Sequence, residues 1–111
     1  MRPFASSAGA QHAAILGIGG YRPSRVIPNS EVIEAIDSSD EWIQQRSGIR
    51  QRRWANAEET VQVMSVAAAR KAIDQAGISA EQIDCVIVAT VSHMLQTPAI
   101  ATAIAHELGA N

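Results

Sequence analysis

The spacing of apolar residues predicts one long helix, over residues 60–76. There apolar side chains recur at intervals of three and four residues, which places them on one face of a helix. Thr60 is suited to cap the first turn, and Gly77 to end the last one. Much of the apolar face is alanine, so we expect this helix to pack closely on a neighbouring backbone.

Two continuous apolar runs, residues 13–18 and 85–91, have the composition of buried strands. The second run is rich in β-branched residues, which is typical of a parallel sheet covered on both faces. Residues 21–28 are interrupted by prolines, so we expect an extended connection there. Residues 49–54 alternate in part and carry arginines, which indicates an exposed strand.

Short helices are predicted where a capping residue precedes an apolar stripe. Asn29 or Ser30 is suited to cap the first of them. Ser38 followed by Glu41 forms a capping box for a second short helix, which Gly48 ends.

Two more helix starts follow the long helix. Ser79 and Gln82 form a capping box that opens a single turn. Thr97 is a candidate cap and Pro98 a first-turn proline for a helix over residues 99–108. The order of these elements predicts an α/β fold with layered helices on a sheet.

Composition bounds the class of protein. The chain has 111 residues, 47% of them hydrophobic, a net charge of −2 and one cysteine, which argues against disorder and against a nucleic-acid partner. No apolar run approaches the roughly 20 residues that span a bilayer, so no membrane partner is expected. We expect residues 1–11 to be a flexible N-terminal extension of a cytoplasmic protein, and residues 12–111 to be the folded part.

The strongest candidate for ligand binding is the pair of Trp42 and Arg46. The two residues are four apart, so they share one face of the predicted short helix. An indole stacks on a flat base, and a guanidinium pairs with phosphate oxygens. The alternative is that Trp42 is a core anchor and Arg46 covers it with its aliphatic stem.

The remaining reactive side chains do not predict a catalytic or metal site. Cys85 starts an apolar strand and has no cationic neighbour in sequence, so we expect a buried structural thiol. His12, His93 and His106 lack the spacing of metal ligands, and no metal site is expected.

Residues 17–20 are rich in glycine, and Asp37 follows about twenty residues later, as in a dinucleotide-binding turn. That turn requires a helix that opens at the glycines, and Pro23 and Pro28 lie where the helix would run. We therefore expect these glycines to allow a sharp exit from the strand and close backbone packing.

One segment resembles a known family. Residues 37–49 read Asp-Ser-Ser-Asp-Glu-Trp-Ile-Gln-Gln-Arg-Ser-Gly-Ile, which is similar to the signature segment of the β-ketoacyl-acyl-carrier-protein synthase III family. Residues 17–23, 59–61 and 86–90 support the likeness. The resemblance implies the N-terminal part of the thiolase-like fold and an initiating condensing enzyme of fatty-acid synthesis.

The resemblance also implies roles for four residues. Ser38, Trp42 and Arg46 match positions at the coenzyme A entrance, where they would hold the base, stack on adenine and meet the phosphates. Thr97 precedes the proline that reaches into the acyl pocket of the partner subunit in a homodimer. Some relatives carry a bulky aromatic residue there, so a threonine implies longer or more branched primers than acetyl.

The family's catalytic cysteine, histidine and asparagine have no counterpart in this chain, so we expect no catalytic residue here and no activity from these residues alone. The complete enzyme would condense an acyl-CoA primer with malonyl-acyl-carrier protein; coenzyme A enters as a substrate, and no cofactor is expected. Two alternatives remain. One is a related acyltransferase or condensing enzyme of a secondary, polyketide-type pathway, and the other is a non-catalytic module that binds coenzyme A or a carrier protein.

Overall fold

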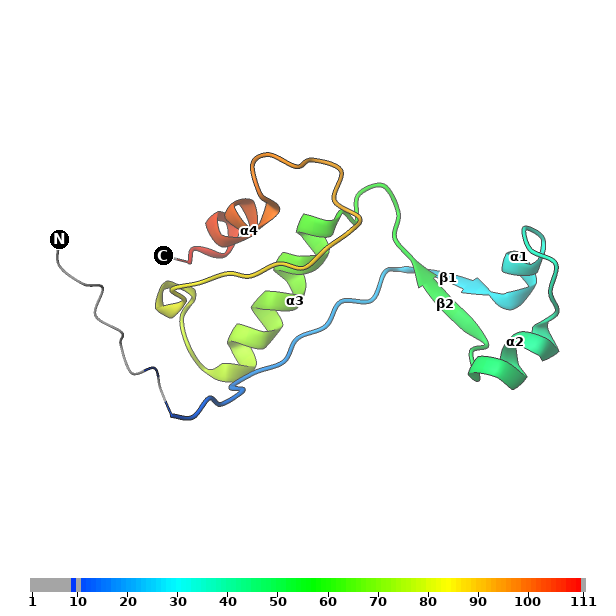
Figure 1. The fold of residues 1–111 in the computed structure, drawn as a ribbon, viewed down its shortest axis with the longest axis horizontal. Helices are drawn as coiled ribbons and strands as arrows, with labels where there is room; N and C mark the ends of the chain where they lie inside the picture. Colours follow the sequence, from blue (N-terminus) through cyan, green and yellow to red (C-terminus); the bar gives the residue numbers. More distant parts are fainter. Residues whose placement is uncertain (1–8, 10, 111) are drawn as a thin grey trace, which may run out of the picture.

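The computed structural model of the chain describes residues 9 and 11–110. The predicted N-terminal extension, residues 1–11, therefore lies almost wholly outside the described residues. The molecule is elongated, measuring 64 × 34 × 30 Å, with two short helices at one end, two longer helices at the other, and a two-stranded ribbon between them (Figure 1). The elements in chain order are β1 (Arg25–Pro28), α1 (Asn29–Ile33), α2 (Asp40–Ser47), β2 (Gln51–Trp54), α3 (Val61–Ala76), the 3-10 turn η1 (Ala80–Gln82) and α4 (Ile100–Leu108).

The long predicted helix is confirmed as α3. The hydroxyl of Thr60 accepts a hydrogen bond from the backbone N–H of Val63 at 3.2 Å, and Gly77 ends the helix with a φ of 66°, a conformation that glycine adopts readily. The core lies between α3 and α4. Its buried members are Val66, Ile100 and Ile104, with Val61, Val86, Val88 and Leu108 packed around them.

The alanine face of α3 packs on the backbone of the segment before β1, as predicted. A Cβ built on Gly17 would collide with the carbonyl oxygen of Ala72, and one on Gly19 with the carbonyl oxygen of Ala68. The side chain of Gln75 fixes the same segment, because its Oε1 accepts a hydrogen bond from the backbone N–H of Ile18 at 2.6 Å. No helix opens at these glycines, which agrees with the rejection of a dinucleotide-binding turn.

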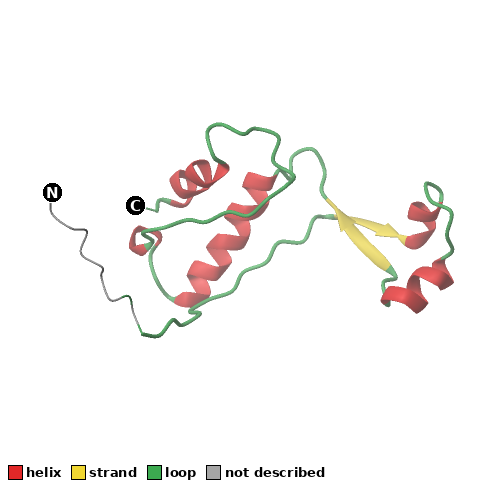
Figure 2. Cartoon of the chain, in the orientation of Figure 1, coloured by secondary structure: helices red, strands yellow, loops and turns green. Residues whose placement is uncertain are grey.

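The two apolar runs predicted as buried strands are not strands in this structure. Residues 13–18 and 85–91 run as extended loops along α3 (Figure 2), and the only sheet within residues 11–110 pairs β1 with β2. Their apolar side chains are largely exposed; Ile87 is 89% accessible. A strand needs a neighbour to satisfy its backbone hydrogen bonds, and neither run has such a neighbour here.

The ribbon joins β1 and β2 in antiparallel register, with Arg25 opposite Trp54 and Pro28 opposite Gln51. Strand β2 confirms the predicted exposed strand. Strand β1 was missed, because its prolines favoured an extended connection. Ile27 of β1 is fully buried and anchors the ribbon.

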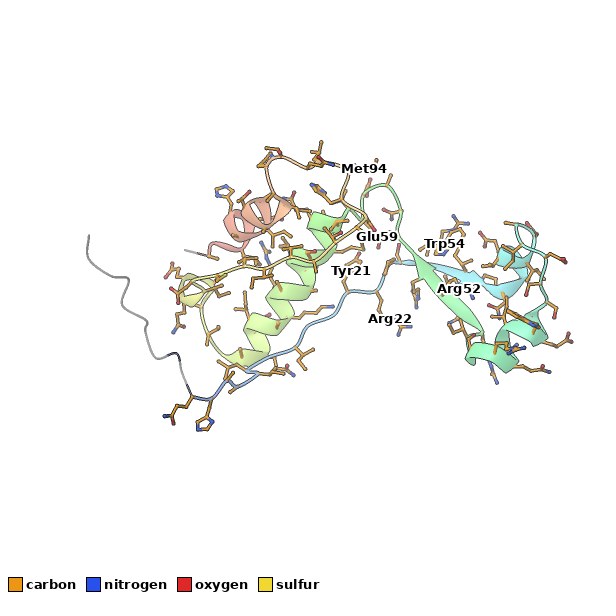
Figure 3. The ribbon with its side chains drawn as sticks, viewed as in Figure 1. Tyr21, Arg22, Arg52, Trp54, Glu59 and Met94 are labelled. Atoms are coloured by element: carbon orange, nitrogen blue, oxygen red, sulfur yellow. The ribbon has the colours of Figure 1, made fainter. Side chains whose placement is uncertain are left out.

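A buried carboxylate ties the ribbon to α3. Glu59 accepts hydrogen bonds from the Tyr21 hydroxyl at 2.7 Å and from the backbone N–H groups of Ser24 and Asn56 at 2.9 Å each. The Asn56 N–H, followed by the Tyr21 hydroxyl, holds the pKa of Glu59 below its ordinary value, and the bond to Glu59 raises the pKa of Tyr21. Tyr21 and Glu59 lie where the chain passes from the ribbon to α3 (Figure 3).

The predicted helix starts need two corrections. Helix α4 begins at Ile100 with Ala99 as its N-cap, so the Thr97 and Pro98 pair does not open it. Helix α1 follows Pro28 and has no side-chain cap. The capping box of η1 is confirmed, and Gln82 Oε1 accepts from the backbone N–H of Ser79 at 2.9 Å. Among the described helices, none has the length and apolar content that crossing a membrane requires.

Candidate functional site

Helix α2 carries the candidate ligand residues and is defined by a cap at each end. The Ser39 hydroxyl accepts a hydrogen bond from the backbone N–H of Trp42 at 3.1 Å, and Gly48 ends the helix with a φ of 71°. The predicted capping box was wrong by one residue, because Ser39 and not Ser38 is the N-cap. Arg46 lies in the last turn, where the helix dipole favours a positive charge.

Trp42 and Arg46 share a face of α2, as their spacing predicts. The guanidinium carbon of Arg46 lies 5.7 Å from the centroid of the Trp42 ring, within the range of a cation–π interaction. Trp42 is 55% exposed, so it is not a core anchor in this structure. The indole therefore presents accessible surface, with a fixed positive charge beside it.

A hollow of ≈ 570 Å³ lies next to this indole. Its lining residues are Ile36, Asp37, Ser38, Ser39 and Trp42. The Oγ atom of Ser38 is buried and has no hydrogen-bond partner among the described residues, so it retains an unused donor and acceptor. Ser38 and Trp42 thus line one hollow, and Arg46 lies against the indole without being one of the lining residues.

Thr97 is not part of this cluster. It is exposed in the loop before α4, and that loop lies on the α3 side of the ribbon, away from α2 (Figure 1). The structure therefore brings together three of the four predicted site residues and leaves the fourth at another surface. The predicted contact of Thr97 with a partner subunit stays a prediction.

The other candidate side chains do not form a second reactive centre. Cys85 is exposed, which corrects the prediction of a buried thiol, because the run that it begins has no neighbouring strand to cover it. The described residues contain no group of histidine, cysteine and carboxylate side chains that could hold a metal ion. A second hollow, of ≈ 590 Å³, lies between the start of α3 and the loop before α4; Glu59 and Met94 are among its lining residues.

A second pair of tryptophan and arginine lies on the ribbon. The guanidinium carbon of Arg25 is 5.8 Å from the centroid of the Trp54 ring, and Arg25 also forms an ion pair with Glu31. The residues are distant in sequence and meet only through the register of β1 and β2. Local spacing therefore gave no signal for this pair. Trp54 is 46% exposed, but it does not line the hollow beside α2.

Asn29 is the residue near the site that sequence reasoning misassigned. It is 1% exposed, and its amide nitrogen donates to Asp40 Oδ1 at 2.6 Å and to the carbonyl oxygen of Ile49 at 2.8 Å. Its amide oxygen accepts from Arg52 at 3.0 Å. The sequence suggested a cap of α1, whereas the side chain connects α2 and β2.

The sequence is similar to known proteins of one family. No protein-family model matches the chain. The β-ketoacyl-[acyl-carrier-protein] synthase III of Streptomyces glaucescens is 62% identical over 93% of this chain and 31% of its own length. The sequence matches the N-terminal portion of the β-ketoacyl-acyl-carrier-protein synthase III family. The chain thus spans about a third of the length of the curated relatives it matches.

Solved structures agree with the match to synthase III. The priming β-ketosynthase of the R1128 polyketide pathway superposes with a TM-score of 0.82 and 50% identity, over 87% of this chain and 30% of that one. The 3-oxoacyl-[acyl-carrier-protein] synthase III of Aquifex aeolicus gives a TM-score of 0.79 and 38% identity, over 86% and 30% of the two chains. The fold is therefore the N-terminal part of the thiolase-like α/β fold of these enzymes.

Proposed function

We propose that α2 and the segment before it form the coenzyme A entrance of a β-ketoacyl-acyl-carrier-protein synthase III. The observation that carries the proposal is the exposed Trp42 indole, held against Arg46 beside a hollow that is lined by Ser38, whose hydroxyl has no hydrogen-bond partner among the described residues. A flat indole suits a purine, a guanidinium suits phosphate oxygens, and a free hydroxyl suits a polar atom at the edge of the base.

The complete polypeptide would perform the condensation in two steps. A cysteine thiolate attacks the thioester carbon of acyl-CoA, and coenzyme A leaves as its thiol. Malonyl-acyl-carrier protein then loses carbon dioxide, and the resulting carbanion attacks the acyl-cysteine, which releases the cysteine and gives a β-ketoacyl-carrier product. We propose that the cysteine, with its assisting histidine and asparagine, belongs to the part of the family that this chain does not span.

A specific observation favours a second candidate, a priming condensing enzyme of a polyketide pathway. One matching structure is a priming β-ketosynthase, at 50% identity. Both candidates use the same entrance and the same two steps, and they differ in the primer and the carrier. Assays of the purified full-length enzyme with fatty-acid and polyketide carrier proteins would separate them, because the preferred carrier identifies the pathway.

We further propose that the complete enzyme is a cytoplasmic homodimer that takes coenzyme A as a substrate and holds no cofactor. Light scattering on the purified full-length protein tests the dimer; a monomeric mass at micromolar concentration would contradict it.

The entrance itself is tested by substitution in the full-length enzyme. Trp42→Ala should weaken binding of coenzyme A by about 1–3 kcal/mol, the usual value of one base stacked on an aromatic ring. Adding Arg46→Ala to that variant should weaken binding further. Trp54→Ala is the matched control, since Trp54 also lies under an arginine but does not line the hollow. Calorimetry should give an unchanged dissociation constant for the control. Equal effects at both tryptophans would contradict the proposal.

A further inference from the structure

Both ends of α2 are held by one buried amide. Asn29 donates to Asp40, the first residue of α2, and to the carbonyl oxygen of Ile49, which follows the end of that helix. The backbone N–H of Asn29 also donates to the carbonyl oxygen of Arg50 at 3.3 Å. The segment that enters α2 and the segment that leaves it are therefore fixed to the same residue.

Helix α2 has little else to set its orientation. It is eight residues long, and Ile43 is its only buried residue. A helix of this length is marginal on its own and depends on tertiary contacts. Because α2 buries only one apolar side chain, its orientation depends strongly on the polar contacts of Asn29.

The position suits an amide and not a carboxylate. The nitrogen of Asn29 faces the carboxylate of Asp40, and its oxygen faces the guanidinium of Arg52. An asparagine supplies the donors and the acceptor that these neighbours need. An aspartate would lose both donor contacts and would bring a second negative charge beside Asp40.

We propose that Asn29 is a positioning residue for the coenzyme A entrance, which orients Trp42 and Arg46 by holding both ends of α2. This inference rests on the proposed function of that entrance. Asn29 does not line the hollow, so it acts through the helix and not through contact with the ligand.

A double-mutant cycle in the full-length enzyme tests the inference. Asn29→Asp should raise the dissociation constant of coenzyme A about tenfold, because it unpairs buried groups and places like charges together. Adding Asp40→Asn restores a hydrogen bond between positions 29 and 40 with donor and acceptor exchanged. The contact with the carbonyl oxygen of Ile49 stays lost, so the double variant should bind more tightly than Asn29→Asp and more weakly than wild type.

A matched control separates positioning from general loss of stability. Glu59→Gln alters another buried polar residue with several partners, on the far side of the ribbon from α2 (Figure 3). It should lower the melting temperature without changing the dissociation constant for coenzyme A. In steady-state kinetics, Asn29→Asp should raise the KM for acyl-CoA and leave the KM for the malonyl-carrier unchanged.

A ligand-free measurement keeps this inference distinct from the proposed function. The fluorescence emission of Trp42 is obtained for each protein by subtracting the spectrum of the same protein that also carries Trp42→Phe. Asn29→Asp should shift that fluorescence emission, and the double variant should return it part of the way to the wild-type value, whether or not coenzyme A binds at the entrance. Unchanged emission, or a double variant that binds no better than Asn29→Asp, would overturn the inference. If Asn29→Asp fails to fold, the double variant must still fold and bind with a dissociation constant no more than about tenfold above that of wild type.

Discussion

Gly19 lies directly against the carbonyl oxygen of Ala68, and there is no room between them for a side chain. Gly17 stands in the same relation to Ala72, four residues further along α3. The glycine-bearing segment therefore approaches the helix backbone along about one turn. This contact positions the chain that leads into β1, and through β1 it positions the end of the molecule that carries α2.

Replacing Gly19 by alanine should destabilise the protein. The added methyl group meets a backbone carbonyl, which cannot rotate away as a long side chain can, so we expect a loss of about 1–3 kcal/mol or more. Gly20→Ala is the control, because a Cβ there has nothing within 4 Å. Thermal unfolding of the full-length variants measures both effects; equal melting temperatures would show that the close contact is absent.

The stability of the protein should decrease as the pH is lowered, because the Glu59 carboxylate becomes protonated. Its pKa in the fold lies below the ordinary value of 4.5, so its contribution is complete above that pH and is lost as the pH falls through the lower, folded pKa. Glu59→Gln should lower the melting temperature at neutral pH and flatten its decline in acid. Glu58→Gln, at the exposed neighbouring position, should retain the wild-type profile. If the melting temperature of Glu59→Gln declined in acid as steeply as that of wild type, the prediction would be contradicted.

Substitutions of Ser38 and Ser39 should have different effects, because Ser38 is proposed to bind the ligand and Ser39 stabilises the helix. Ser39→Ala removes the cap of α2 and should reduce stability by about 1 kcal/mol. Ser38→Ala removes a hydroxyl that has no partner in the structure, so it should leave stability unchanged and weaken coenzyme A binding. Melting temperature and calorimetry on the two variants check this contrast, and the reverse pattern would assign the cap to Ser38.

Thr97→Phe in the full-length enzyme should narrow the choice of primer toward acetyl-CoA. Thr97 is exposed here, and in the proposed homodimer an aromatic ring at that position would occupy space in the acyl pocket of the partner subunit. Competition assays with acetyl-CoA and longer or branched acyl-CoA substrates measure the preference. Thr97→Ser serves as the control, since it keeps a small side chain. An unchanged chain-length preference in Thr97→Phe would refute the assignment.

Features that depend on residues close together in the sequence were predictable. The three-and-four spacing, Thr60 and Gly77 gave α3 to within one residue at its start. Its alanines predicted close packing on a neighbouring backbone, which the structure identifies as the segment of Gly17 and Gly19. The spacing of Trp42 and Arg46 gave their shared face. The cap of α2 was misassigned because two adjacent serines precede the helix, and only the fold decides that Ser39 caps it while the Ser38 hydroxyl stays without a partner.

Features that depend on distant partners were not predictable. Strand β1 exists because of its pairing with β2, and Asn29 finds its side-chain partners 11, 20 and 23 residues away. The runs over residues 13–18 and 85–91 show the opposite case. Their composition is that of strands, but composition supplies no neighbour, and without one they form no ladder.

Those two runs have a practical consequence for handling a chain of this length. Val91 is fully exposed, and Ile15 and Ile87 nearly so, on backbone that has free donors and acceptors. Extended, β-branched segments of this kind template association with other copies. The 111-residue chain, made alone, is thus expected to aggregate, and Val91→Lys is the kind of substitution that suppresses such assembly.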